Sequence, residues 1–202
     1  MVADYTFQVF YDNFKAVCYN DRKVGRIRMK TDQLSNEEIV DYCRQDADKL
    51  FTYLPWLETK SGHSTYSTYK DEGIAQNSLT FPVYDSTLLA FVKEAANTCF
   101  MDRNHVYVYS RNRLKDAGDE LRLIEKATIR DMDQLAGILS HYILGGRTKA
   151  LLWSEGVQNG VYLAVLRKIK EIIDFWERDA FYERDAFRER DAFRERDAFR
   201  GN

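Results

Sequence analysis

The side chains best suited to bind an anionic partner are cations on alternate positions of a candidate strand. Arg26, Arg28 and Lys30 are separated by Ile27 and Met29, and alternate residues of a β-strand face opposite sides. The apolar side could cover a core while three cations face outward. Such a row suits phosphate groups or an acidic protein surface. The alternative is ordinary solvated charge on a near-neutral protein.

A second basic stretch, residues 107–115, combines tyrosines with Arg111 and Arg113. Tyrosines beside arginines can stack on the bases of single-stranded nucleic acid and pair with its phosphates. Here too, ordinary solvated charge is the alternative. We therefore expect both basic stretches to contribute the residues that bind a protein partner or a nucleic acid, namely Arg26, Arg28, Lys30, Arg111 and Arg113.

A glycine pair, Gly145 and Gly146, precedes Arg147 and Lys149. A phosphate-binding P-loop needs a different order of residues and follows a strand, whereas an apolar helical run precedes these glycines. We predict a corner between two helices, in which one glycine adopts the left-handed conformation that closes the first helix. A weak anion site at Arg147 and Lys149, beside the start of the next helix, is the alternative.

Catalytic motifs are missing from the sequence. It has no Gly-x-Ser-x-Gly nucleophile motif and no His-Glu-x-x-His metal motif. The histidines are scattered along the chain (His63, His105 and His141). We therefore predict no catalytic residue, metal or cofactor, and an enzyme of unrecognised type ranks third among the possible functions.

The composition limits the class of protein further. The 202 residues are 45% hydrophobic and 14% aromatic, which is enough for a real core. The formal net charge of −2 does not imply a global attraction to nucleic acid or to an anionic membrane, so such binding requires a local patch. No apolar run approaches the roughly 20 residues that span a bilayer, and the first ten residues do not resemble a secretory signal. The three cysteines are far apart (Cys18, Cys43 and Cys99). This spacing favours reduced thiols in a cytoplasmic protein.

The N-terminal part predicts strands followed by a helix. Apolar residues alternate over residues 5–11, and two further runs, residues 14–19 and 22–30, suggest a small strand meander within residues 1–34. Ser35 and Glu38 then form a capping box. The helix that follows should end near Leu54 because of Pro55.

The middle of the chain mixes both kinds of element. Residues 60–78 are polar and predict a long loop or a pair of weak strands, and residues 79–84 predict a short extended segment. Asp85 or Ser86 should cap a helix. Residues 105–109 alternate in a way typical of a strand.

The second half predicts helices. Thr128 should cap a helix that runs to about residue 143, a short helix should follow and stop near Gly160, and a last helix should cover residues 161–176. One-sided helices must pack on something. We therefore predict an α+β fold, with a small antiparallel sheet packed against about four or five amphipathic helices. Residues 1–176 should form one domain.

The C-terminus is a repeat. The sequence Glu-Arg-Asp-Ala-Phe occurs four times within residues 177–202, with a period of six residues. In a helix this period turns successive phenylalanines by 600°, so they form no stripe, and a coiled coil is excluded. We expect a solvated helical extension or a flexible end. The alternative is a peptide that binds another chain through its phenylalanines.

Several separate stretches carry a resemblance to a known family. They are residues 48–58, residues 79–84 before a helix, residues 133–139 running into residues 143–147, and residues 156–160 followed by residues 166–170. From about residue 42 to residue 173, the chain resembles a bacterial and phage family known only as a domain of unknown function. The resemblance implies a compact α+β unit and no known reaction.

Together these observations predict a non-enzymatic protein-interaction module of a bacterium, a phage or a mobile element. Its partner would be a protein, such as a nuclease or a nucleoprotein complex. One example is an inhibitor of a host defence system, of the anti-CRISPR kind. Direct nucleic-acid binding through the basic residues is the alternative.

Overall fold

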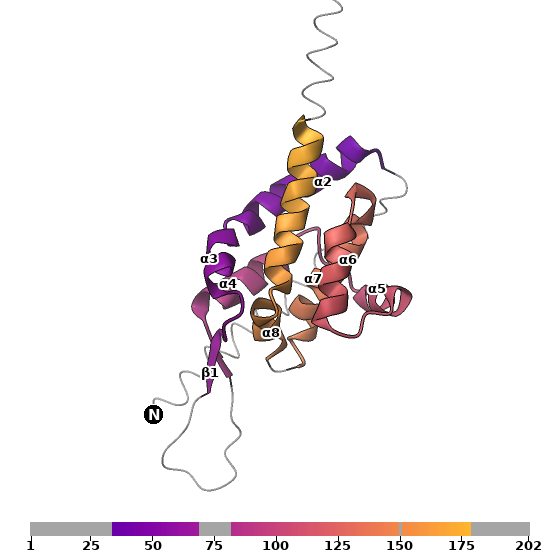
Figure 1. Ribbon diagram of the computed structural model, residues 1–202. Helices are drawn as coiled ribbons and strands as arrows, with labels where there is room; N and C mark the ends of the chain where they lie inside the picture. Colours follow the sequence, from indigo (N-terminus) through magenta and orange to yellow (C-terminus); the bar gives the residue numbers. More distant parts are fainter. Residues whose placement is uncertain (1–33, 69–81, 150, 179–202) are drawn as a thin grey trace, which may run out of the picture.

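The computed structural model describes residues 34–68, 82–149 and 151–178 (Figure 1). The predicted N-terminal strand meander, including Arg26, Arg28 and Lys30, lies outside these residues, as does the repeat from residue 179 onward. In the described part, helices pack around one hydrophobic core, and a small sheet lies at one end (Figure 1). The described helices include none with the length and apolar character needed to cross a membrane.

Helix α2 spans Asn36–Phe51 and begins at the predicted capping box. The amide of Glu38 donates to Ser35 Oγ at 3.1 Å, and the amide of Ser35 donates to Glu38 Oε2 at 2.7 Å. These two bonds satisfy amides that have no partner within the helix. The buried side of α2 carries the apolar residues Ile39, Val40, Cys43, Ala47 and Leu50.

The predicted end of α2 near Leu54 is wrong, because the helix ends at Phe51. Pro55 instead lies in the first turn of a separate helix, α3, which spans Leu54–Lys60. Proline fits a first turn because its missing N–H has no partner there in any case, and its fixed φ suits a helix.

The sheet consists of β1, Tyr66–Thr68, and β2, Pro82–Tyr84. The strands are antiparallel, with Tyr66 opposite Tyr84. The prediction of an extended segment is thus confirmed over residues 82–84. The α+β class holds in this general sense, although helices make up most of the described chain.

Helix α4 spans Ser86–Ala95 and follows β2 directly. Its cap is Asp85, whose Oδ1 accepts from the amide of Thr87 at 2.8 Å. This contact decides between the two cap residues that the sequence left open. The predicted apolar side is buried through Leu88, Phe91, Val92 and Ala95.

The predicted strand at residues 105–109 is wrong, because these residues begin helix α5, His105–Asn112. In helical register Val108 is buried and His105, Tyr109 and Asn112 are half-buried, while Val106 is exposed. This spacing of three and four residues is the inward face of a helix. The alternation that suggested a strand placed Val106 and Val108 on one side, and packing against α7 overrides it.

Helix α6, Ala117–Lys126, was not predicted. Asp116 caps it by accepting from the amide of Asp119 at 2.9 Å. Figure 1 shows α6 between the C-terminal helix and α5, so that α5 lies at the edge of the helical body.

Helix α7, Met132–Gly145, is the centre of the core and follows a short 3-10 helix, η3, at Ile129–Asp131. Thr128 and Asp131 form a capping box at the start of η3. Helix α8 spans Leu152–Gln158, and residues 161–178 form the C-terminal helix. The predicted apolar stripes of α7 and the C-terminal helix are confirmed, since their residues are buried apart from Trp176, which is partly buried.

The glycine pair does form the corner between α7 and α8, but the predicted left-handed glycine is wrong. Gly146 has φ −65°, and the left-handed residue of the corner is Leu151, with φ 76°. Glycine is needed here for space. A Cβ at Gly146 would overlap the Trp153 ring, and one at Gly145 would lie 2.8 Å from Leu152.

Candidate partner-binding surface on helix α5

Helix α5 presents two large apolar side chains to solvent. Val106 is 66% exposed and Tyr107 is 55% exposed. The segment from residue 103 to residue 115, which contains α5, has four cationic residues and no carboxylate. The cations, all exposed, are Arg103, Arg111, Arg113 and Lys115. We call Arg103, Val106, Tyr107, Arg111 and Arg113 the α5 face.

The helix positions these side chains as a group. Tyr107 and Arg111 are four residues apart and therefore share one side of α5. Arg111 lies in the last turn, where a cation is favoured by the helix dipole. Arg113 is the C-cap, in the left-handed conformation with φ 54°. Arg111 and Arg113, which the sequence singles out, are both exposed at the C-terminal end of α5, and Val106 is exposed on the same helix.

The inward side of α5 is held against α7 by close packing. Gly137 of α7 lies directly under Val108, and a Cβ at this glycine would be 2.5 Å from Val108 Cγ2. Such an approach is open only to glycine. The contact fixes α5 on the body of the protein, so its outer side chains have a defined orientation.

A buried carboxylate ties α5 to two further helices. Glu120 of α6 is only 3% exposed. Its Oε1 accepts from the Tyr109 hydroxyl of α5 at 2.7 Å, and its Oε2 accepts from the Tyr142 hydroxyl of α7 at 2.7 Å. We call these three residues the Glu120 cluster. Hydrogen bonds to a charged group are among the strongest in proteins, so the cluster fixes α5, α6 and α7 relative to one another.

Burial dominates the electrostatics of this cluster. It raises the pKa of Glu120, and the two tyrosine hydrogen bonds oppose that rise. Burial also raises the pKa of Tyr109 and Tyr142, and their bonds to Glu120 raise it further. Both tyrosines therefore keep their protons and act as donors.

Two of the histidines that are scattered in the sequence meet beside α5. The ring of His141, on α7, stacks on Tyr109 with 4.2 Å between centroids, and the His105 ring lies 5.7 Å away edge-on. Burial lowers the pKa of His141 to about 4, helped by His105 and Lys149. His141 is therefore neutral at pH 7. His63 is elsewhere, exposed after α3.

The Glu120 cluster and the histidine pair were missed because residues 105–109 were assigned to a strand. In a helix, His105 and Tyr109 are four residues apart and share a side, and an inward polar pair of this kind requires partners. The partners Glu120 and His141 come from other helices, so no local pattern identifies them.

One buried hydroxyl near the cluster has no hydrogen bond within the part of the chain that the structure describes. The Tyr162 side chain is fully buried, and its hydroxyl has no hydrogen-bond partner among the described residues. Its ring packs 5.6 Å from the Tyr142 ring and 4.9 Å from the Phe91 ring. Gly156 makes room for it, since a Cβ there would lie 2.6 Å from the Tyr162 ring.

The arrangement favours a structural role for the Glu120 cluster. General acid–base chemistry requires a group that reaches a substrate, whereas Glu120 is buried with both oxygens bonded to tyrosines. Within the described ranges, no group of three or more histidine, cysteine or acidic side chains is placed to hold a metal.

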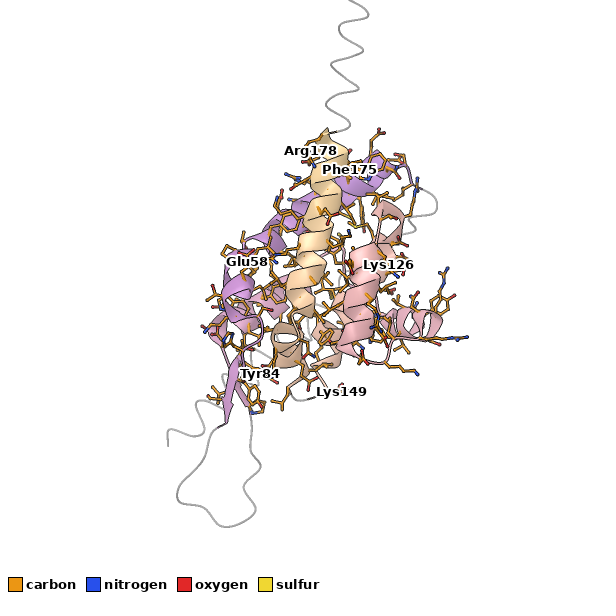
Figure 2. All side chains as sticks on the ribbon, in the orientation of Figure 1. Glu58, Tyr84, Lys126, Lys149, Phe175 and Arg178 are labelled. Atoms are coloured by element: carbon orange, nitrogen blue, oxygen red, sulfur yellow. The ribbon has the colours of Figure 1, made fainter. Side chains whose placement is uncertain are left out.

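Arg147 and Lys149 lie in the turn between α7 and α8, and Figure 2 shows Lys149 at the edge of the molecule. The amides that an anion would need at the start of α8 are partly in use. The amide of Leu151 donates to the Tyr84 hydroxyl at 3.0 Å, and that of Leu152 donates to the Lys149 carbonyl at 3.4 Å. The anion site stays a prediction. Helix α5 presents a larger group of exposed cationic and apolar side chains.

Comparison of the chain with protein-family models, curated proteins and solved structures found no match. The function is therefore inferred from the surface itself.

Proposed function

We propose that this protein is a non-enzymatic interaction module that binds an acidic protein partner through the α5 face. The observation that carries the proposal is an exposed pair, Val106 and Tyr107, in a cationic segment without carboxylates. The helix that presents the pair is held by the Glu120 cluster and by the contact of Val108 with Gly137.

A protein partner suits this composition. The centre of a protein interface is enriched in aromatic and apolar side chains and in arginine, and its rim is polar. Val106 and Tyr107 supply such a centre, and Arg103, Arg111 and Arg113 supply the rim. Complementary charge on the partner speeds association and excludes wrong partners. An inhibitor of a nuclease or nucleoprotein complex of a host defence system, of the anti-CRISPR kind, is one form of such a module.

Nucleic-acid binding is the second candidate, and the spacing of Tyr107 and Arg111 favours it. An aromatic ring can stack on a base while a neighbouring arginine pairs with phosphate. The exposed aliphatic side chain of Val106 argues for the protein partner, because backbone phosphates offer it no contact surface.

Neutralising the α5 face tests the proposal. The double variant Arg111→Gln, Arg113→Asn removes two charges, and asparagine tolerates the left-handed conformation at position 113. The matched control is Lys93→Gln, Lys126→Gln, which removes two exposed cations from the last turns of α4 and α6. In capture from a bacterial lysate, the wild type and the control should retain the same protein, and the α5 variant should lose it. Equal retention by both variants would contradict the proposal.

The second candidate is tested by fluorescence anisotropy with a labelled single-stranded oligonucleotide. Direct binding to phosphates falls steeply as salt rises from about 50 to 200 mM. We expect no binding that depends on Arg111 and Arg113 even at low salt. If such binding occurs and is lost in the α5 variant, the nucleic-acid function replaces the proposed one.

A further inference from the structure

Helix α2 carries a surface of opposite charge to that of α5. Its 16 residues include five carboxylates and two cations. Glu37 and Asp41 are exposed on α2, and Tyr42, which follows Asp41, is 44% exposed. We call Glu37, Asp41 and Tyr42 the α2 face.

An exposed aromatic side chain of the C-terminal helix lies at the same end of the molecule. Arg44 Nη1 of α2 pairs with Glu177 Oε1 at 2.5 Å, which brings the end of the C-terminal helix against α2. Phe175, two residues earlier, is 51% exposed, and Figure 2 shows it beside α2. The α2 face therefore combines carboxylates with exposed aromatic surface.

The two faces are complementary in both charge and apolar character. The α5 face offers arginines around Val106 and Tyr107, and the α2 face offers carboxylates around Tyr42. Helix α2 packs on α4 and η3, whereas α5 packs on α7 at the edge of the body (Figure 1). Since the two helices occupy separate parts of the fold, the two faces can meet only between copies.

We propose that the α5 face of one copy docks on the α2 face of a second copy. This contact is heterologous, because each copy uses a different surface, so association can continue beyond a dimer. It occupies the same α5 face as the proposed partner, and the two contacts therefore compete. The faces are small and their charges are exposed, so the association should be weak and strongly weakened by salt.

Sedimentation velocity of the full chain provides the first test. At about 25 mM salt the weight-average sedimentation coefficient should rise with protein concentration, and at about 500 mM salt, where exposed charges are screened, it should stay at the monomer value. A monomer at every concentration in low salt would overturn the proposal. The test needs no partner, so its outcome is separate from that of the capture experiment.

Complementation between two variants identifies the surfaces. The double variant Arg111→Gln, Arg113→Asn neutralises the α5 face and Asp41→Arg reverses a charge on the α2 face, so each variant alone should be monomeric in low salt. The two changed faces carry no opposite charges at these positions and therefore gain no attraction for each other. A mixture retains one intact face of each kind and should form a heterodimer that cannot extend. Glu125→Arg, a reversal at an exposed position on α6, is the control and should associate like the wild type. Failure of the mixture to associate, or association of either variant alone, would show that other surfaces are involved.

Discussion

At the scale of single residues, two buried tyrosine hydroxyls differ in their hydrogen bonding. The Tyr142 hydroxyl donates to Glu120 at 2.7 Å, whereas the Tyr162 hydroxyl has no partner among the described residues. A buried polar group without a partner costs about 1–3 kcal/mol, and a hydrogen bond to a charged group contributes about 1.5–3 kcal/mol. We therefore expect the same chemical group to have opposite effects on stability at the two positions.

Removing each hydroxyl should separate these effects. Tyr162→Phe should leave the free energy of unfolding unchanged or raise it by up to about 1 kcal/mol, because it deletes a hydroxyl that has no partner among the described residues. Tyr142→Phe should lower it by about 1–3 kcal/mol, because Glu120 loses a donor. Urea unfolding at pH 7 measures both. A loss for Tyr162→Phe as large as that for Tyr142→Phe would mean that its hydroxyl has a partner.

The neutral His141 predicts a dependence of stability on pH. Because its pKa is lowered from 6.5 to about 4 in the folded protein, the unfolded chain binds the proton more readily between these values. Its stabilising contribution is therefore complete above pH 6.5 and is lost as the pH falls toward 4. For a half-buried ring, solvent screening reduces the loss to the order of 1 kcal/mol.

The variant His141→Gln isolates that contribution. Glu120 acts in the opposite sense, because its raised pKa makes stability fall as the pH rises, so the wild-type curve contains both effects. The difference in free energy of unfolding between wild type and variant should shrink as the pH falls from 6.5 to 4. A constant difference across this window would show that the His141 pKa is not lowered by folding.

At the scale of elements, the corner between α7 and α8 is set by side-chain packing. Gly146 has an ordinary helical φ, so alanine suits its backbone, but a Cβ would overlap the Trp153 ring. Trp153 is itself fixed, because its Nε1 donates to the Ile143 carbonyl at 2.9 Å.

A double-mutant cycle tests this explanation of the corner. Gly146→Ala should lower the free energy of unfolding by about 1–3 kcal/mol in the wild-type background, as overpacking does. In a Trp153→Ala background the same change should cost little, since the overlapping ring is gone. Chemical denaturation of the four proteins gives the coupling energy. Equal costs in both backgrounds would point to the backbone instead.

Elements with local signals could be predicted from the sequence. The capping box at Ser35 and the Asp85 cap involve neighbours in the chain, and the stripes of α7 and the C-terminal helix repeat over several turns. Helix α5 has only eight residues, and its two valines on alternate positions favour a strand, so only packing against α7 reveals the helix.

The residues of the candidate surface differ in how far the sequence indicates them. Arg111 and Arg113 stand out in the sequence because they are cations beside tyrosines. Residues 105–109 were expected to form a strand, and the exposure of Val106 follows only from the helical register of α5. Glu120 and His141 become neighbours of α5 only through contacts between helices.

At the scale of the whole molecule, the net charge is only −2, but cationic and acidic side chains are concentrated on different elements. The segment from residue 103 to residue 115 has cations alone, whereas α2 is predominantly acidic. Near-neutrality therefore does not imply a global attraction to an anionic partner but allows a local one. Both proposals, partner binding and association between copies, depend on this separation.

Photo-crosslinking from two exposed valines tests the central claim most directly. Val106 of the α5 face is 66% exposed, and Val83 of β2 is 51% exposed on a different element. A photoreactive residue at each position reports which surface a captured partner contacts. The α5 face predicts a crosslink between the partner and position 106 and none at position 83. A crosslink at position 83 alone, or equal crosslinks at both positions, would contradict the account.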